Sequence, residues 1–411
     1  MKIIYKFLAL TLFLSCFNCT DEILLDTQNF EDVLVVEATI TNELKQQEVK
    51  LSRTYFLEDS NQIIENNATV VITDNQGNTY NFTQNSEGAY FSDVAFTAMP
   101  NTAYTLSITT SNGKQYSSLK TELSPVSQID ELYAEVSSGG TSPNNIQVLL
   151  NSNNETTNAQ YFRYKFTETH KIVVPYYSWY NLEMSNIIDD GIAFDLNLVP
   201  KLENQRICFT TNSSNNIIQT STNALNQNIV NKLQIRTIDK DDPLIRERYS
   251  IIVKQYVQNP GAYNFYKKIN ELGNNQSLLS QNQPGYIIGN ISAVNNEKER
   301  IIGYFDVSSV TSKRIYFNFQ DLNLPQPKYP YDCDYRTDEL EIANYNKNHL
   351  KLNYALNGGN RNHRAQLYKF LSPAWGYKYK SGIAGIYFIV SPECGDCTSY
   401  SSNLKPNFWV D

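Results

Sequence analysis

The sequence predicts a mainly β protein: an N-terminal immunoglobulin-like or transthyretin-like β-sandwich, then a larger antiparallel β-rich domain with one amphipathic helix. Three observations support this prediction. Short runs of alternating apolar and polar residues recur along the chain, separated by turn residues. The 411 residues include 29 Tyr and 19 Phe but only 3 Met, which favours strands over helical bundles. One segment alone combines helical apolar spacing with clear helix ends.

The N-terminus has the three parts of an export signal. Lys2 and Lys6 supply the positive start, and residues 7–14 (FLALTLFL) form an apolar run that is too short to span a bilayer. A buried strand is the alternative for such a run, but a chain that begins Met-Lys favours the leader. We therefore expect residues 1–18 to be a lipoprotein signal peptide and residues 19–31 to be an acidic tether.

A cysteine directly after such a leader indicates lipidation, and there are two candidates. Ser15 is the better local fit for cleavage, which favours Cys16. If Cys19 is instead the acylated first residue, four cysteine thiols remain, an even number that suits an oxidising compartment. The two acids that follow Cys19 also resemble the export tags of surface lipoproteins in Bacteroidota. We expect Cys19 to be the lipid anchor, with Cys16 as the alternative, and several acyl chains to hold the protein on the outer membrane, facing outward.

Residues 32–124 are expected to form the first domain. About seven short strands with regularly spaced turns fit a small β-sandwich. The clearest hairpin spans residues 104–118, where Tyr104, Leu106 and Ile108 share one face. Asn112-Gly113 fits a type I′ turn. Other strand-like runs are residues 32–41, 49–53 and 68–84.

Residues 125–411 are expected to form the second domain, with further strands and long polar loops. Its one clear helix runs from Pro260 to Leu272, with Pro260 at its start and Gly273 at its end. We expect its apolar stripe to pack on a sheet. The clearest strand-like runs are residues 145–152, 161–174, 206–211, 232–238, 248–257, 284–294, 300–309, 314–319 and 385–392.

Four cysteines remain after the leader. Cys394 and Cys397 have the CxxC spacing of half a zinc site, but Cys208 and Cys333 stand far apart and form no second close pair. A redox motif is a further alternative, although the pair lies in a polar tail. In an exported protein two disulfides are the favoured interpretation, and three pairings are open.

Other motifs of catalysis are missing from the sequence. His170, His349 and His363 are scattered, and there is no nucleophile elbow, phosphate-binding loop or dinucleotide motif. The net charge of −8, without a Lys/Arg cluster, argues against nucleic acid. We expect no enzyme, no cofactor and no metal site.

Aromatic side chains concentrate in three segments whose proline and polar neighbours indicate loops. Tyr and Trp in loops suit recognition of sugar rings or of a protein partner, because they offer large rigid faces with a polar group. The alternative is that they cover the ends of the sheets as local core. We expect ligand or partner binding by Tyr176, Tyr177, Trp179, Tyr180, Tyr329, Tyr331, Trp375 and Tyr377, with Tyr335 and Tyr379 in the same segments.

In five places the chain resembles the Bacteroidota lipoprotein family known as domain of unknown function 4249. They are Cys19 with its acidic neighbours and residues 34–41, 68–77, 104–116 and 394–409. The Asn before Cys19 departs from the family pattern. The resemblance implies an outer-membrane lipoprotein, often encoded beside a TonB-dependent transporter, and it implies no catalytic residues.

Together these features predict a surface-exposed, non-catalytic accessory or binding subunit of a TonB-dependent β-barrel, with a glycan or peptide as possible ligand. The alternative is a structural component of envelope assembly or adhesion without a small ligand, for which we expect a flat polar surface around the aromatic loops. A hydrolase is a third hypothesis, which requires two carboxylates about 5 to 10 Å apart in a cleft.

Overall fold

The computed structural model confirms a mainly β protein. The predicted signal peptide, the tether and both lipid-anchor candidates, Cys16 and Cys19, lie outside the residues that it describes. The structure describes residues 32–54, 63–137, 139, 144–188, 193–274, 287–296, 298–333, 336–339, 366–371 and 386–411.

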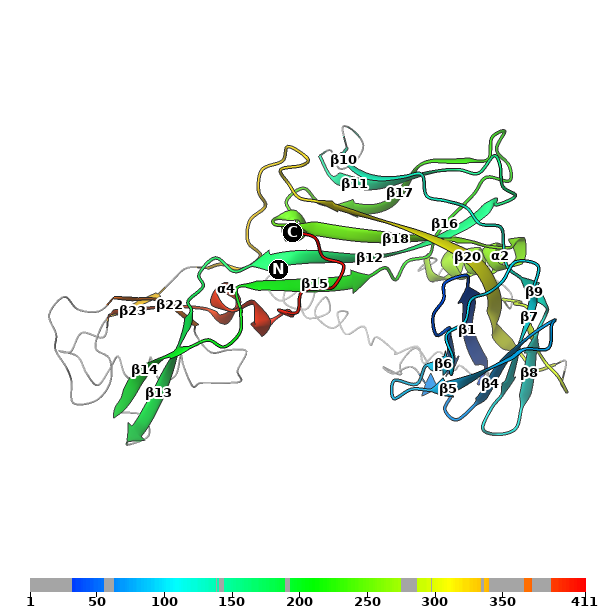
Figure 1. Cartoon of the computed structure of the whole chain (residues 1–411), viewed down its shortest axis with the longest axis horizontal. Helices are drawn as coiled ribbons and strands as arrows, with labels where there is room; N and C mark the ends of the chain where they lie inside the picture. Colours follow the sequence, from blue (N-terminus) through cyan, green and yellow to red (C-terminus); the bar gives the residue numbers. More distant parts are fainter. Residues whose placement is uncertain are drawn as a thin grey trace, which may run out of the picture.

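A β-sandwich forms at the N-terminal end (Figure 1). Alternate side chains point into one core, which contains Val36, Ile72 and Leu106. Its strands are β1 (Leu34–Thr41), β2 (Glu48–Arg53), β3 (Ile63–Ile64), β4 (Thr69–Asp74), β5 (Thr79–Gln84), β6 (Tyr90–Ser92), β7 (Ala103–Thr109), β8 (Gln115–Ser118) and β9 (Thr121–Glu122).

The hairpin of β7 and β8 is confirmed, but its predicted type I′ turn is wrong. Gly113 has a φ of +82°, whereas Asn112 is not among the described residues with positive φ. Thr110 and Lys114 close a three-residue loop, because Thr110 N donates to Lys114 O at 3.0 Å and Gly113 N donates to Thr110 O at 2.9 Å. Such a loop needs only one residue in the left-handed region, and glycine takes that position.

The chain returns to this sandwich after almost 170 further residues. β19 (Ile291–Ala293) pairs with β8, and the first half of β20 (Ile301–Phe317) pairs in parallel with β1, from Leu34↔Ile301 to Thr41↔Ser308. Ile291 and Phe305 thereby join the N-terminal core. Every other pairing among the described strands is antiparallel. The sandwich therefore contains strands from both sides of residue 124.

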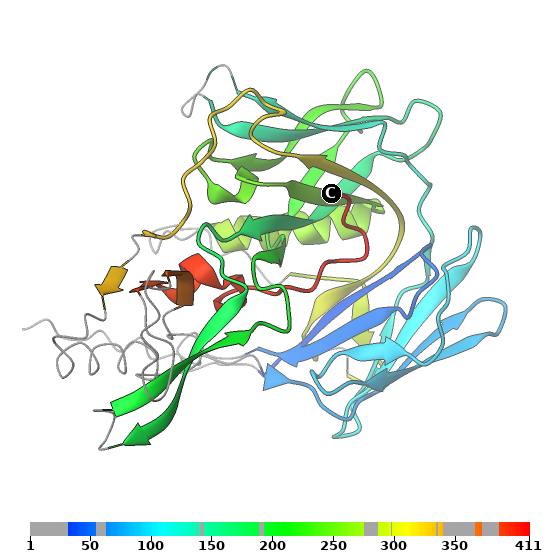
Figure 2. The ribbon, with the colours of Figure 1, turned by 60° about the vertical axis from the view of Figure 1, so that its left-hand side comes forward.

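The second half of β20 belongs to a second β-layer, as Figure 2 shows from another side. This half pairs with β18 (Tyr249–Val257), which pairs with the long β12 (Tyr161–Val173). A separate three-stranded sheet packs against this layer around a core that includes Phe162, Tyr164 and Ile251. The remaining strands of the two sheets are β15 (Ile207–Ser213) and β16 (Ile218–Ser221) beside β12, and β10 (Glu131–Val136), β11 (Ile146–Asn153) and β17 (Ile229–Ile238) opposite.

The predicted amphipathic helix is confirmed as α2 (Pro260–Asn274), which packs against β12 and β20 (Figure 1). It begins at Pro260 as expected and continues past Gly273 by one residue. Its side chains Ala262 and Phe265 are buried.

Ser124 connects the two sandwiches at the point where β20 changes partners. Its hydroxyl donates to Val257 O at 2.5 Å and accepts from Ser309 N at 3.0 Å. Its own N–H donates to Val307 O at 3.2 Å. The link between the two layers is therefore hydrogen-bonded on both sides.

We expect Ser124→Ala to lower the free energy of unfolding by about 2 kcal/mol, because it leaves a buried N–H and a buried carbonyl without their partner. Chemical denaturation of the two proteins measures the difference. Ser107→Ala, at an exposed position of β7, is the control and should change stability by no more than about 0.5 kcal/mol. Equal effects of the two substitutions would contradict the role of Ser124.

The remaining elements lie at the other end of the molecule from the N-terminal sandwich (Figure 1). Trp409, near the C-terminus, is buried between Phe209 and Tyr316, with ring centroids 4.9 and 6.1 Å away. The elements at this end of the molecule are the hairpin β13 (Tyr180–Ile188) and β14 (Ala193–Pro200), the strands β21 (Arg336–Glu339), β22 (Gln366–Leu371) and β23 (Ile386–Val390), and the short helices α4 (Pro392–Gly395) and η5 (Cys397–Ser399).

Candidate functional site

α4 fastens two of the predicted aromatic loops together. The backbone N–H of Tyr176 donates to Cys394 O at 3.0 Å, and the Tyr329 hydroxyl donates to Glu393 O at 2.7 Å. A disulfide also joins Cys333 to Cys394. Residues 175–180 and 327–333 are therefore held on one short helix, although they lie about 150 residues apart in the sequence.

The structure selects one of the three open cysteine pairings. Cys208 bonds to Cys397 and Cys333 bonds to Cys394, with Cα atoms 5.8 and 5.6 Å apart. The two cysteines of the CxxC segment thus have different partners, which agrees with two structural disulfides and excludes a CxxC disulfide. Among the described residues, no group of three or more His, Cys, Asp or Glu is arranged to hold a metal ion.

The disulfide between Cys208 and Cys397 forms the centre of a small apolar cluster. Ile172 and Val174 of β12 and its following loop contact it from one side. The rings of Tyr177, Tyr329 and Tyr400 pack around the same cluster. Tyr400 and Tyr329 also join their hydroxyl groups at 2.6 Å. Since the Tyr329 hydroxyl donates to Glu393, Tyr400 is the donor within this pair.

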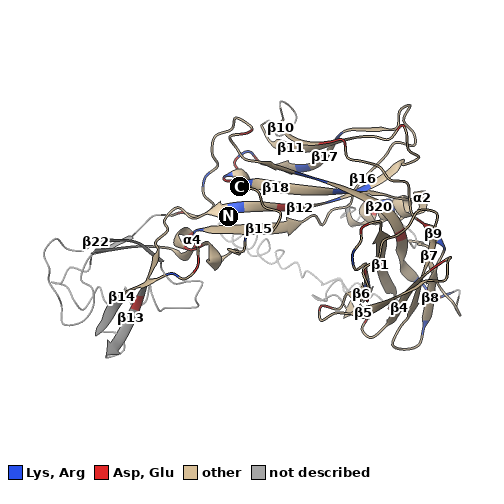
Figure 3. Cartoon of the chain, viewed as in Figure 1, with Lys and Arg blue, Asp and Glu red and all other residues tan. Residues whose placement is uncertain are grey.

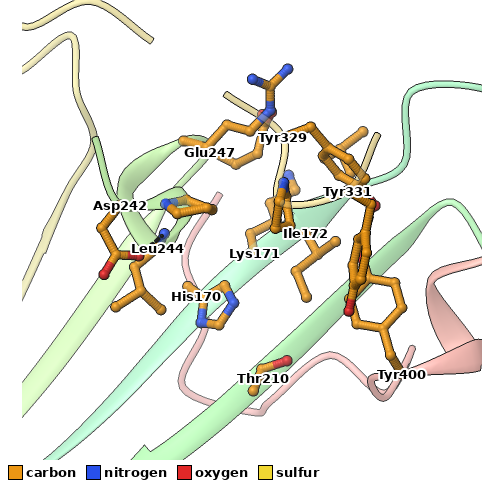
Figure 4. Close-up of a pocket in the computed structure, with 14 residues that line it drawn as sticks. His170, Lys171, Ile172, Thr210, Asp242, Leu244, Glu247, Tyr329, Tyr331 and Tyr400 are labelled. Carbon is orange, nitrogen blue, oxygen red and sulfur yellow. Dashed lines mark hydrogen bonds and ion pairs between the residues drawn. The ribbon is translucent and has the colours of Figure 1, made fainter. Parts of the chain in front are cut away.

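A cavity of about 280 Å³ opens beside this cluster. In Figure 4, Tyr331 and Tyr400 lie on one side, Asp242 and Leu244 lie on the other, and His170 lies below. The lining combines aromatic faces with both acidic and basic groups, as ligand sites commonly do. The complete lining is His170, Lys171, Ile172, Val173, Thr210, Asp242, Pro243, Leu244, Arg246, Glu247, Tyr329, Pro330, Tyr331 and Tyr400.

The charged groups of the lining already have partners in the chain. The Asp242 carboxylate accepts from Leu244 N at 3.0 Å, at the start of the short helix η2 (Pro243–Ile245). Arg246 Nε lies 3.7 Å from a Glu247 oxygen, and burial raises the pKa of Glu247. The Arg246 guanidinium also lies 5.9 Å from the centre of the Tyr329 ring. These contacts hold the charged side chains of the cavity wall in place.

His170 is the titratable group of the cavity floor. Burial lowers its pKa below the ordinary value, and its Nδ1 has no hydrogen-bond partner among the described residues. The neutral imidazole is therefore the form that the folded protein favours near pH 7.

We expect His170 to make stability fall as the pH drops below about 6.5, the ordinary pKa of histidine. Below that pH the unfolded chain binds a proton at this position more readily than the folded chain does. The loss continues until the pH reaches the lowered pKa of the folded state. Denaturation at pH 7.5 and pH 5.5 measures it, and His170→Gln should lose less stability between these values than the wild type. An equal loss in both proteins would contradict this expectation.

The predicted aromatic residues are placed differently from one another. Tyr331 is 40% exposed at the edge of the cavity, with its ring 5.1 Å from that of Tyr400. Tyr329 lines the cavity, but its hydroxyl donates to Glu393 O of α4. Trp179 is 65% exposed outside the cavity, and its ring meets that of half-buried Tyr177 edge-on at 5.2 Å. Tyr176 is half-buried and Tyr180 is exposed; Tyr335, Trp375, Tyr377 and Tyr379 lie outside the described residues.

Several lining residues were not predicted as site residues. His170 stands within β12, and Asp242 directly precedes η2. Tyr400 follows the CxxC segment in the polar tail. The single signal for Tyr400 was its proximity to Cys397, whose disulfide brings the tail to β15. Nothing in the local sequence places His170 opposite Tyr331.

Charged residues of both signs are spread along the described chain. Figure 3 shows Lys and Arg positions interspersed with Asp and Glu positions over the described strands. In the part of the chain that the structure describes, no helix has both the length and the hydropathy needed to cross a membrane.

Two solved structures that are similar to the chain resemble it only remotely. The Yersinia pseudotuberculosis adhesin InvE shares 10% identity with a TM-score of 0.14, over 70% of this chain and 58% of that one. A Corynebacterium diphtheriae protein described as membrane anchored shares 12% identity with a TM-score of 0.13, over 56% and 55%. The chain thus spans less than two thirds of either protein, and neither likeness supports an argument about function.

The sequence was also compared with curated proteins and with models of protein families. No curated protein matches the chain. A family model described as a domain of unknown function (DUF4249) matches residues 20–314, from the acidic tether into β20. Since this match covers well over half of the sequence, the chain belongs to the DUF4249 family.

Proposed function

We propose that this protein is a surface-exposed outer-membrane lipoprotein that binds a ligand without turnover, as an accessory subunit of a TonB-dependent transporter. The leader, the acidic residues after Cys19 and the family resemblance support the location and the partner. The lipid on Cys19 anchors the chain. The acidic tether then separates the folded domains from the membrane.

The tyrosine-lined cavity is the observation that carries the binding role. Tyr331 offers an exposed aromatic face, while Tyr329, Tyr400 and the two disulfides hold its surroundings in place. A rigid aromatic wall costs little conformational entropy on binding. The volume of about 280 Å³ lies near the lower limit of ligand sites, so it suits one ring of a glycan or one side chain of a peptide.

The second candidate function is adhesion or envelope assembly, and one observation favours it. Trp179 and Tyr180 are exposed where the hairpin of β13 and β14 begins, outside the cavity. Exposed Trp and Tyr are frequent anchors of protein interfaces. Against this alternative, the surface at Tyr331 is a pocket and not the flat polar face that a purely structural role predicts.

Purification of the tagged protein from mildly solubilised outer membranes, followed by mass spectrometry, tests the proposal. We expect a TonB-dependent barrel in near-equal amount with the wild type. Protease treatment of intact cells should also cleave the protein. A solitary or protease-protected protein would contradict the proposal and would turn attention to free-standing adhesion or a periplasmic location.

Tyr331→Ala separates ligand binding from partner binding. We expect it to weaken binding of the ligand found by glycan and peptide screens by about tenfold or more, because it removes the exposed aromatic face. Leu119→Ala, at an exposed position of the N-terminal sandwich, is the matched control and should bind like the wild type. Equal affinities of all three proteins would exclude the cavity as the binding site.

A further inference from the structure

A second cavity, of about 570 Å³, lies at the junction of the two sandwiches. α2 forms one wall, the start of β12 forms another, and the first parts of β1 and β20 close it from the N-terminal sandwich. Figure 1 shows these four elements meeting at one place. All residues that line this cavity belong to the described part of the chain, and none of them lines the tyrosine cavity.

Arg163 places a buried positive charge in this cavity. The side chains of Phe162 and Tyr164 point into the core on the other face of β12, so Arg163 points toward α2. Arg163 is 5% exposed, and its guanidinium lies 4.3 Å from the ring centre of Tyr266 and 4.9 Å from that of Tyr256. Its Nε has no hydrogen-bond acceptor, and no carboxylate among the described residues forms an ion pair with it.

Lys165 adds a second cation two residues further along the same face of β12. The Lys165 side chain as a whole is exposed, but partial desolvation of its ammonium group, together with the neighbouring charge of Arg163, lowers its pKa. No described carboxylate lies within ion-pair distance of this ammonium either. Two cations without a bound carboxylate are costly side by side, and an anionic ligand would relieve that cost.

The remaining walls of the cavity are largely apolar. Phe265, Ile269 and Leu272 of α2 line the cavity together with Ile302 of β20, and polar lining comes from residues 214–216. Two cations beside a mainly apolar helix face match an amphipathic anion. We propose that this cavity binds a long-chain carboxylate, whose carboxylate group contacts Arg163 and Lys165 and whose hydrocarbon chain lies along α2.

Two acidic residues share this region and limit which ligands fit. Glu37 lines the cavity from β1 and is exposed. Asp306 is completely buried and accepts from the Ser308 hydroxyl at 2.7 Å. Burial raises the pKa of Asp306, which reduces the compensation that it gives to Arg163. The site therefore suits a single negative charge better than a dianion.

Binding of myristate carrying ¹³C in its carboxyl group to the purified full chain tests this proposal. We expect saturable binding of one molecule per chain. Calorimetry measures the affinity, and a shift of the ¹³C carboxyl resonance reports contact with the cations. Lys165→Met and Arg163→Met should each weaken binding by about tenfold or more, since each removes a charge-assisted hydrogen bond. Lys232→Met, in the separate three-stranded sheet, is the control and should bind like the wild type.

A comparison with an uncharged ligand distinguishes a carboxylate site from a cavity that binds hydrocarbon alone. Tetradecanol, with the same chain and no charge, should bind to the wild type at least about tenfold more weakly than myristate does. Its affinity should be the same for the wild type and for Lys165→Met, because it carries no charge. Equal affinities of the wild type for myristate and tetradecanol, or unchanged affinity in Lys165→Met, would overturn the proposal. Absence of saturable myristate binding would overturn it as well. Because Lys165 is exposed, its variant remains informative even if Arg163→Met fails to fold.

Discussion

Replacing Cys208 and Cys397 together by alanine is expected to lower the free energy of unfolding by about 4–5 kcal/mol. The bond joins residues 189 positions apart, so it removes much of the freedom of the unfolded chain. Both sulfurs are also buried in the cluster that supports Tyr177, Tyr329 and Tyr400. Denaturant titration of the oxidised wild type and the double variant measures the loss.

The other disulfide provides the matched control. Cys333 and Cys394 are 61 positions apart, so their replacement should cost about 1 kcal/mol less on the same entropic argument. It should nevertheless weaken ligand binding more, because it releases the segment that carries Tyr331 from α4. A greater loss of stability in the Cys333 and Cys394 variant, or unchanged ligand binding, would contradict the assigned roles.

Gly289→Ala is the second substitution with a large expected effect. A Cβ atom at this position would lie 1.6 Å from the backbone oxygen of Gly303 and 3.5 Å from the Phe265 ring. No rotation of a side chain relieves a collision with backbone. The segment before β19 must therefore move away from β20, which disturbs the second entry of the chain into the N-terminal sandwich. We expect a loss of about 3 kcal/mol or more.

Thermal and denaturant unfolding of Gly289→Ala measure this loss. Gly273→Ala is the control, since a Cβ at Gly273 meets nothing within 4 Å and alanine favours a helix by about 1 kcal/mol. The control should match or exceed the stability of the wild type. A Gly289→Ala protein as stable as the wild type would show that the close approach of β20 is unnecessary.

Local patterns in the sequence predicted much of the fold. Alternation in residues 104–118 predicted a hairpin, and Pro260 with its apolar stripe predicted α2. The parallel pairing of β1 with β20 was not predictable, because it joins residues that lie more than 260 positions apart. Local periodicity shows which face of a strand is buried but not which strand lies beside it.

The candidate site was predictable only in part, for a related reason. The aromatic loop segments predicted Tyr329 and Tyr331 as binding residues, and the even number of cysteines predicted two disulfides. The choice of pairing, and with it the approach of Tyr400 to the cavity, depends on distant contacts. His170 looks like any other strand residue until η2 places Asp242 and Leu244 opposite it.

We propose that the cavity beside Tyr331 is where this protein binds its ligand. Incorporation of a photoreactive phenylalanine at position 331 in living cells tests it most directly, with position 119 of the N-terminal sandwich as the reference. We expect light-dependent adducts with the ligand at position 331 and none of these at position 119. Identical adducts at the two positions, or none at position 331, would contradict it.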